Sequence, residues 1–289
     1  MQANFLISLS YSETRYLLPL LPHYDKGSLV APGGGRISYL MLGDGSIPLV
    51  FIPGGGDGLT TVSDAARRIA FFYRKRASRY RMLLLSRRQP IPFDFTVDRH
   101  ADDYAWAMEL LEWEPSVIEC SSAGGPIGQW LAVKRRDLVR GVILSCTLHR
   151  TDPHTRAVIE HWMRLARRGW WYELRMSSIE YTYRLQTVEK YQRFLPLLRM
   201  LRDPRYPERL VRIFEGLLDL DNRPILPDIE HPVLVIGGEE DRVIPAYIQR
   251  EMADLMPNSH LILYPGYGHG NDQENPDYAR QVDVFTRSI

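Results

Sequence analysis

The segment at residues 116–125 constrains the fold of this chain more than any other stretch. It reads Ser-Val-Ile-Glu-Cys-Ser-Ser-Ala-Gly-Gly, an apolar strand that runs directly into a turn of small residues, and residues 126–133 then start an amphipathic helix. A strand that reverses sharply into a helix strains the backbone of its turning residue, so the residues two before and two after it must be small. The turning residue predicted here is Ser122, with Cys120 and Gly124 at those two positions.

Two more strands of the same kind follow in the last quarter of the chain. Residues 232–238 form a continuous apolar run ended by glycines, which is typical of a strand buried on both faces of a parallel sheet. Asp241 comes directly after this strand. Residues 261–264 form the second strand, which leads into a glycine-rich loop that carries His269. The sequence therefore places Ser122, Asp241 and His269, in this order, after three predicted strands.

These three side chains are those of a nucleophile, an orienting acid and a base. Each also has a plainer interpretation. Ser122 could mark only a strand-to-helix connection, and His269 could be a hydrogen-bonded loop residue. Asp241 could be a solvated loop charge like its neighbours Glu239 and Glu240, and Glu240 is the other candidate for the acid. We favour the catalytic interpretation because the serine turn follows a buried strand and the acid and histidine come in the order that this turn predicts.

With a fourth motif, the chain resembles the α/β-hydrolase superfamily from about residue 28 to its end. Residues 51–58 read Phe-Ile-Pro-Gly-Gly-Gly-Asp-Gly and follow a predicted strand where this superfamily usually carries a His-Gly motif, with Pro53 in place of the histidine. The glycines lack the Lys-Ser/Thr ending of a phosphate-binding loop. Glycines at this turn let a backbone N–H approach a substrate oxygen, and the resemblance implies an oxyanion hole formed by the N–H groups of Gly55 and Ala123.

The resemblance implies an α/β-hydrolase fold: a mostly parallel eight-stranded sheet with helices on both faces and an inserted all-helical lid. The alternation of strands and helices supports a doubly covered sheet. Strands are predicted at 35–42, 47–52, 80–85 and 117–120, and helices at 65–78 and 98–112. The turn at 43–46 favours an antiparallel hairpin between the first two of these strands.

The chain is expected to form one catalytic domain with an insertion. We predict an N-terminal extension at 1–27, the core at 28–146 and 229–289, and the helical lid at 147–228. Four amphipathic helices are expected in the lid, at 155–168, 170–184, 188–201 and 207–218. Ligand clefts of open α/β sheets form at the carboxyl ends of the strands, so a lid inserted there would cover the predicted nucleophile.

Arginines and histidines raise two further hypotheses. The simplest interpretation of the many lid arginines is that they face water; alternatively a lid arginine, or Arg87 or Arg88, pairs with a substrate carboxylate. His149, His154 and His161 lack a carboxylate or cysteine set at ligand spacing, so we predict no metal site. No cofactor is predicted.

Composition excludes some classes of partner. The formal net charge is +1, which gives no reason to expect nucleic acid or an anionic membrane as the main partner. No stretch approaches the roughly 20 apolar residues of a membrane span, and residues 5–9 are too short for a signal segment, so we expect a cytoplasmic protein.

Two residue types in the predicted strands have structural interpretations. The cysteines, Cys120 and Cys146, are expected to be buried and reduced. Glu119, an acid inside a predicted buried strand, is expected to accept hydrogen bonds from backbone or arginine groups.

The function that the resemblance implies is hydrolysis of a small carboxylic ester or lactone, as in carboxylesterases and enol-lactone hydrolases. A serine at position 122 argues against dehalogenase and epoxide-hydrolase chemistry, which in this superfamily uses an aspartate there. Carbon–carbon bond hydrolysis, acyl transfer and prolyl aminopeptidase activity stay open; the last needs a lid acid such as Glu160, Glu173 or Glu180. A binding protein without turnover is the alternative from another class. The expected partner is a small-molecule acyl substrate, and the oligomeric state stays open.

Overall fold

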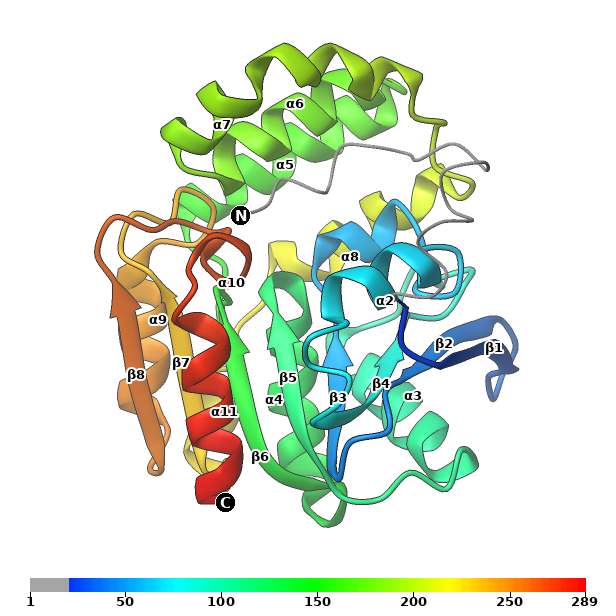
Figure 1. Cartoon of the computed structure of the whole chain (residues 1–289), viewed down its shortest axis with the longest axis vertical. Coiled ribbons are helices and arrows are strands. Elements are labelled where there is room, and N and C mark those ends of the chain that lie inside the picture. Colours follow the sequence, from blue (N-terminus) through cyan, green and yellow to red (C-terminus); the bar gives the residue numbers. More distant parts are fainter. Residues whose placement is uncertain (1–20) are drawn as a thin grey trace.

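The computed structural model describes residues 21–289, so most of the predicted N-terminal extension lies outside it. An eight-stranded sheet runs through the middle of this part, with the strand order β1-β2-β4-β3-β5-β6-β7-β8 (Figure 1). The strands are β1 (Tyr24–Val30), β2 (Arg36–Leu42), β3 (Ile47–Ile52), β4 (Tyr80–Leu85), β5 (Ser116–Ser121), β6 (Val139–Ser145), β7 (Val233–Gly238) and β8 (Ser259–Tyr264).

The antiparallel part of the sheet differs from the predicted hairpin. Strands β3 to β8 are parallel to one another, whereas β2 is antiparallel to both of its neighbours, β1 and β4. The hairpin predicted between residues 35–42 and 47–52 is therefore wrong. β3 is an apolar strand that lies between two parallel neighbours, β4 and β5, and such a strand belongs in the interior of a parallel sheet. The hairpin partner of β2 is β1, so the predicted core boundary at residue 28 falls inside a strand.

Helices cover both faces of the sheet, and the side chains of successive strand residues point to opposite faces. Val50 and Ile118 belong to a buried cluster that includes residues of α3, α4 and α9. Their neighbours Leu49 and Val117 belong to the cluster on the other face, with α2 and α11. The core helices are α2 (Ala66–Tyr73), α3 (Val97–Leu110), α4 (Gly125–Lys134), α9 (Ala246–Leu255), α10 (Asn271–Glu274) and α11 (Tyr278–Ser288).

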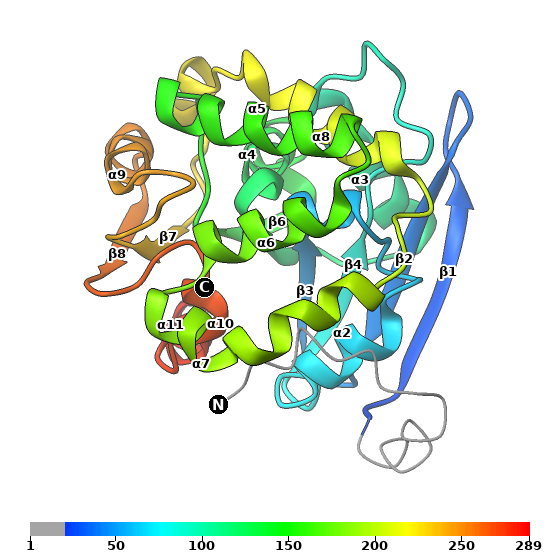
Figure 2. The ribbon, with the colours of Figure 1, turned by 90° about the horizontal axis from the view of Figure 1, so that it is seen from above.

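A helical insertion between β6 and β7 lies over the carboxyl ends of the strands (Figures 1 and 2). Its α-helices are α5 (Pro153–Arg167), α6 (Trp171–Thr182), α7 (Leu185–Tyr191) and α8 (Pro207–Leu218). The single helix predicted at 188–201 is wrong, because α7 ends at Tyr191 and a 3-10 helix, Gln192–Met200, follows. This segment contains Pro196, which has no N–H for an α-helical hydrogen bond and sterically opposes a continuous α-helix.

The insertion leaves and rejoins the core at one place. Arg150, on the outgoing chain, forms an isolated antiparallel bridge with Asp221, on the returning chain. The N–H of Thr151 donates to the carbonyl of Leu220 (3.1 Å), and the N–H of Asn222 donates to the carbonyl of His149 (2.7 Å). The two connecting segments are thus hydrogen-bonded to each other beside the sheet.

Candidate active site

The turn at Ser122 has the strained geometry that its sequence predicts. Strand β5 ends at Ser121, a short 3-10 helix spans Ser122–Gly124, and α4 follows at once. Ser122 has a φ of +49°, in the left-handed region that non-glycine residues rarely adopt. A Cβ on Gly124 would lie 2.4 Å from the carbonyl oxygen of Ile52, so this position needs a glycine.

Cys120 fits the turn because α4 makes room for it. A Cβ on Gly128 would lie only 2.2 Å from the Cys120 sulfur, so glycine one turn into the helix provides the space that the side chain occupies. Cys120 and Cys146 are both buried and free. Burial raises the pKa of the Cys120 thiol, with the nearby charge of Glu119 acting in the same direction, so this thiol stays protonated.

The structure brings Ser122, Asp241 and His269 together in one hydrogen-bonded chain. The Oγ of Ser122 lies 3.0 Å from Nε2 of His269, and Nδ1 of His269 lies 2.9 Å from Oδ2 of Asp241. The other carboxylate oxygen, Oδ1, accepts the N–H groups of Val243 and Ile244, both at 2.8 Å. Asp241 is buried, and the alternative acid Glu240 is exposed. The arrangement can transfer the serine proton to a histidine that a fixed carboxylate orients.

Two acids set the electrostatics of His269. Burial lowers the pKa of its imidazole, but the charge and hydrogen bond of Asp241 and the charge of Asp272 together outweigh this effect, so the net pKa lies above its ordinary value. Asp272 follows in α10, and burial raises its own pKa to about 6; the His269 charge opposes this rise and the Glu119 charge adds to it. Asp272 is a residue of the site that sequence reasoning missed, since nothing in its spacing distinguishes it from a loop acid.

We expect Asp272→Asn to lower the pKa of His269, because it removes a negative charge that favours the imidazolium. The imidazole resonance should be followed by NMR over a pH titration. Because the folded-state pKa of Asp272 is raised, the wild type loses stability as the pH rises from about 4 through about 6, where the partly buried carboxyl must ionise. The free energy of unfolding of Asp272→Asn should therefore exceed that of the wild type at pH 8, and the two proteins should be equally stable at pH 4.

The matched control for this prediction is Asp277→Asn. The Asp277 carboxylate is bonded by Arg280, Tyr264 and Gln281, which lower its pKa, so its replacement should reduce stability at neutral pH and leave the titration of His269 in place. An unchanged His269 pKa in the Asp272→Asn variant would contradict the electrostatic role given to that acid.

Both predicted oxyanion-hole donors lie beside Ser122. A Cβ on Gly54 would come within 3.0 Å of Ser122 Cβ, which places this glycine loop against the serine. Gly55 is the first residue of the 3-10 helix Gly55–Gly58, and Ala123 is the second residue of the 3-10 helix at the turn. The first N–H groups of a helix have no carbonyl of that helix to bond, so they are suited to bind a ligand oxygen.

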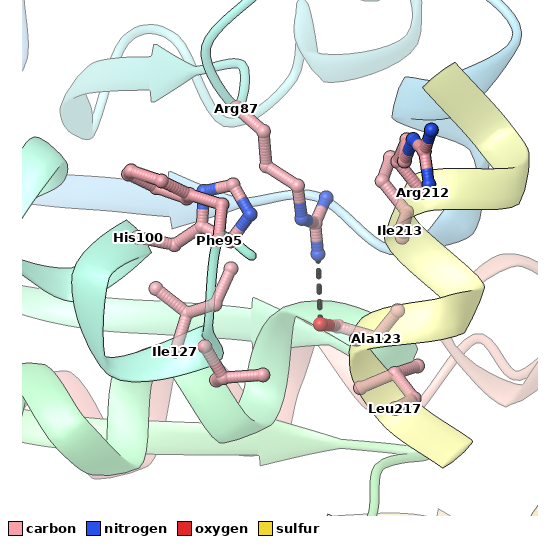
Figure 3. A pocket seen from close by; sticks show the side chains of 10 residues that line it. Arg87, Phe95, His100, Ala123, Ile127, Arg212, Ile213 and Leu217 are labelled. Atoms are coloured by element: carbon pink, nitrogen blue, oxygen red, sulfur yellow. Dashed lines mark hydrogen bonds between the residues drawn. The ribbon is translucent and has the colours of Figure 1, made fainter. Parts of the chain in front are cut away.

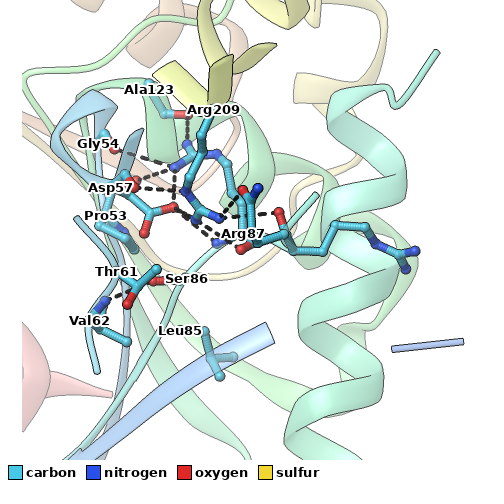
Figure 4. Close-up of polar contacts among 12 residues, drawn as sticks. Pro53, Gly54, Asp57, Thr61, Val62, Leu85, Ser86, Arg87, Ala123 and Arg209 are labelled. Carbon is cyan, nitrogen blue, oxygen red and sulfur yellow. Dashed lines mark hydrogen bonds and ion pairs between the residues drawn. The ribbon is translucent and has the colours of Figure 1, made fainter. Parts of the chain in front are cut away.

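A buried ion-pair cluster, formed by Asp57, Arg87 and Arg209, lies beneath the glycine loop (Figure 4). Arg209 comes from α8, and its Nη2 lies 2.6 Å from Oδ2 of Asp57. Its guanidinium also donates to the carbonyls of Asp57, Arg87 and Arg88. The backbone N–H of Arg87 donates to the same Asp57 oxygen at 3.0 Å. The cluster joins the insertion directly to the loop that carries Gly55.

This cluster corrects one hypothesis from the sequence. Arg87 and Arg88 do not reach toward a substrate carboxylate, because their guanidinium groups are buried against protein acids, Asp57 for Arg87 and Asp103 for Arg88. Arg87 also donates to the carbonyl oxygens of Pro53 and Gly54, at 3.1 and 3.3 Å. Such pairs join residues far apart in the chain, so no local pattern could have identified them.

Arg87 also lines a small cavity beside the serine turn (Figure 3). Its Nη2 donates to the carbonyl of Ala123 at 2.7 Å across one side of this space. The cavity has a volume of about 10 Å³, enough for about one water molecule, so it does not serve as the substrate pocket. The other lining residues are Phe95, Val97, His100, Ile127, Arg212, Ile213, Gly216 and Leu217.

Glu119 behaves as the sequence predicts for a structural acid. Its Oε1 lies 3.0 Å from Nη1 of Arg76, and its Oε2 pairs with Nη2 of the same arginine. The hydroxyl of Tyr278 donates to Oε1 at 3.1 Å.

Two of the insertion histidines have protein partners. His154 Nε2 lies 2.8 Å from the carbonyl of Arg242, and His161 Nε2 lies 3.1 Å from Oγ of Ser177. Within residues 21–289 no set of three or more candidate ligands gathers around a metal-sized space.

No helix in the described part of the chain is long and apolar enough to cross a membrane.

Comparison with known proteins gives matches to one family. The model of the alpha/beta hydrolase family matches residues 49–281. A putative non-heme bromoperoxidase of Mycobacterium tuberculosis is 30% identical over 63% of this chain and 72% of its own length. The 2-hydroxy-6-oxo-6-(2'-aminophenyl)hexa-2,4-dienoic acid hydrolase of Metapseudomonas resinovorans is 24% identical over 89% of both chains.

Among solved structures, an enol-lactonase from Burkholderia xenovorans LB400 superposes with a TM-score of 0.75. It covers 91% of this chain and 100% of its own, at 19% sequence identity. At that identity the likeness concerns the fold alone.

Proposed function

The chain belongs to the alpha/beta hydrolase family, and we propose that it is a serine hydrolase that cleaves a small carboxylic ester or lactone. The observation that carries this proposal is the hydrogen-bonded chain from Ser122 through His269 to Asp241, with distances of 3.0 and 2.9 Å, built on a backbone held at positive φ. A serine activated in this way attacks acyl carbons and forms a covalent acyl-enzyme.

In the acylation step, His269 takes the proton of the Ser122 hydroxyl as the oxygen bonds to the acyl carbon. Asp241 holds the imidazole in the tautomer that presents a free Nε2 to the serine, and it stabilises the imidazolium. The protonated histidine then gives its proton to the alkoxide that leaves. In the second step water attacks the acyl-enzyme and His269 takes its proton. The bond between the acyl carbon and Ser122 Oγ then breaks, His269 returns the proton to Oγ, and the carboxylic acid is released.

The negative charge that develops on the substrate oxygen in both steps is bound by the N–H groups of Gly55 and Ala123. Preorganised donors of this kind usually supply the largest single part of the catalytic effect, and losing one costs about 10²- to 10³-fold in kcat. The position of Gly54 against Ser122, and of both donors at the start of 3-10 helices, supports this assignment.

We propose that the helical insertion acts as the lid of the site and limits the acyl group to a small apolar one. A Cβ on Gly55 would lie 2.9 Å from the Phe214 ring of α8, so an aromatic side chain packs against the oxyanion loop. The Phe214 ring lies 5.8 Å from that of Trp162, which lies 6.0 Å from that of Tyr181. An aromatic wall of this kind favours apolar substituents over charged ones.

Carbon–carbon bond hydrolysis is the second candidate, because the relative from Metapseudomonas resinovorans that matches 89% of the chain is a hydrolase of a 2-hydroxy-6-oxo dienoic acid. Prolyl aminopeptidase activity has less support. Of the acids that could hold a substrate ammonium, Glu173 and Glu180 are exposed, and Glu160 lies at 4.0 Å from Arg156 on the same helix.

A substrate panel on the wild-type protein tests the proposal. We expect turnover of p-nitrophenyl acetate, p-nitrophenyl butyrate and an enol-lactone, and none of a prolyl p-nitroanilide or of a 2-hydroxy-6-oxo dienoic acid. Fluorophosphonate labelling, with the modified peptide located by mass spectrometry, should identify Ser122 in both the wild type and a Ser121→Ala variant. Labelling of Ser122 without turnover of any ester or lactone would overturn the proposed activity. Turnover of the dienoic acid would then favour carbon–carbon bond hydrolysis, and no turnover of any substrate would favour a binding protein.

A further inference from the structure

Each of the two peptide units that form the proposed oxyanion hole is held by a buried side chain through its carbonyl. The N–H of Ala123 belongs to the same peptide unit as the carbonyl of Ser122, which accepts the hydroxyl of Thr147 at 2.5 Å. The N–H of Gly55 shares its peptide unit with the carbonyl of Gly54, which accepts Nη1 of Arg87 at 3.3 Å. The same pattern therefore occurs twice, on two loops far apart in the chain.

A bond to the carbonyl acts on the N–H of the same peptide in two ways. The peptide is planar and trans, so its C=O and N–H point in opposite directions, and a side chain that fixes the carbonyl also fixes the direction of the N–H. Hydrogen bonds in a chain also polarise one another, which strengthens each by roughly 10–30% in condensed-phase estimates. Thr147 and Arg87 thus bind on the side of each peptide away from the substrate.

The surroundings of Thr147 are built to place its hydroxyl under the serine turn. Thr147 is fully buried just after β6, and the preceding residue, Cys146, has a φ of +44°. A Cβ on Gly125 would lie 1.9 Å from Oγ1 of Thr147, so only glycine at the start of α4 lets the hydroxyl approach. The close fit leaves the hydroxyl beside the carbonyl of Ser122.

The second positioning side chain is itself fixed by the ion-pair cluster. Arg87 holds the carbonyls of Pro53, Gly54 and Ala123, and Asp57 holds both Arg87 and Arg209. Because Arg209 lies on α8, the orientation of the Gly55 amide depends on contacts that reach into the insertion.

We propose that Thr147 and Arg87 are positioning residues of the oxyanion hole, which orient and polarise the N–H groups of Ala123 and Gly55. The inference rests on the proposed function, since it concerns the site at which the acyl oxygen binds. Neither side chain touches the substrate. Their effect falls on the transition state, in which the oxygen is charged, more than on the bound ester, in which it is neutral.

The test is a pair of variants at Thr147. Thr147→Val keeps the shape but removes the hydroxyl, and Thr147→Ser keeps the hydroxyl but removes a methyl group. With p-nitrophenyl butyrate, Thr147→Val should lower kcat by about 10-fold, less than the loss of a whole donor, and leave KM within about twofold. Thr147→Ser should retain most of the wild-type kcat. Inhibition by a trifluoromethyl ketone, whose adduct carries an oxyanion, should weaken in parallel with kcat.

The matched control is Thr286→Val in the last turn of α11, and this helix ends at the side of the sheet opposite the insertion (Figure 1). Thr286 is also a buried threonine, bonded to the carbonyl of Asp283 and the hydroxyl of Tyr80, and its replacement should leave kcat and KM unchanged. A Thr147→Val protein with wild-type kcat would overturn the inference, as would equal losses in the Val and Ser variants, which would indicate packing.

The wild-type protein separates this inference from the proposed function. Suppose that the wild type hydrolyses esters but Thr147→Val keeps its kcat, or that Thr147→Val and Thr147→Ser lose kcat equally. Then only the positioning role fails. If the wild type hydrolyses no ester and no lactone, the proposed function fails. Should Thr147→Val not fold, Arg87→Lys provides the second test, because lysine keeps the cation near Asp57 but lacks the guanidinium fork that bonds Gly54 and Ala123 together. It should lower kcat and leave KM near the wild-type value.

Discussion

Ser122→Ala is expected to lower kcat/KM for ester hydrolysis by about 10⁴-fold or more, because the acyl-enzyme cannot form without its oxygen. The Oγ of Ser122 is the group that Nε2 of His269 contacts at 3.0 Å. The rate that survives should come from oxyanion binding and substrate positioning alone. Steady-state kinetics and fluorophosphonate labelling, followed by intact mass, measure both consequences on the same preparation.

Ser121→Ala is the matched control, since it removes a hydroxyl from the adjacent residue of the same turn. It should keep labelling and turnover close to wild type. The midpoint of urea unfolding should differ little between the two variants, which would assign the loss in Ser122→Ala to chemistry. Full labelling of Ser122→Ala would contradict the assignment of the nucleophile.

Asp57→Ala is expected to cause the largest loss of stability, about 3–5 kcal/mol of the free energy of unfolding. Asp57 is 4% exposed and Arg209 is 1% exposed, so the replacement leaves buried guanidinium charge without its counterion. Removing one partner of a buried ion pair costs far more than the pair gains over an apolar contact, because the remaining charge cannot be hydrated. Urea unfolding followed by circular dichroism measures the change.

Glu230→Ala provides the comparison for Asp57→Ala. Glu230 also pairs with an arginine, Arg136 at 3.0 Å, but its side chain is 68% exposed, so the expected change is within about 1 kcal/mol. Asp57→Asn should fall between the two, because the amide oxygen can still accept one guanidinium bond. Equal unfolding midpoints for Asp57→Ala and Glu230→Ala would show that the buried cluster does not stabilise the fold.

Local patterns were sufficient where the physical cause is local. The small residues around Ser122 predict its strained turn, and glycine and apolar runs predict β5, β7 and β8 within a residue or two. The partner of β2 could not be predicted in this way. Strand pairing joins residues that are distant in the chain, and the chain at 24–30 carries no marked apolar run.

The same distinction holds in the site. Asp241 follows the buried strand β7 and His269 follows the apolar, partly buried edge strand β8, so their positions at the carboxyl edge could be predicted, and the structure brings both to Ser122. The sequence alone leaves Arg87 open as a substrate contact, because its partners, Asp57 and Arg209, are distant in sequence and become neighbours only after folding. The influence of Asp272 on His269 likewise depends on burial, which the residue type does not reveal.

The paired connections at Arg150 and Asp221 suggest how such a protein can change its specificity during evolution. Both ends of the insertion meet at one short ladder, whose bonds run between Thr151 and Leu220 and between Asn222 and His149. A segment anchored in this way can be exchanged or resized as a cassette, while the register of β6 with β7 stays unchanged. What such an exchange must preserve is an arginine at the place of Arg209, because its guanidinium bonds Asp57 in the glycine loop below.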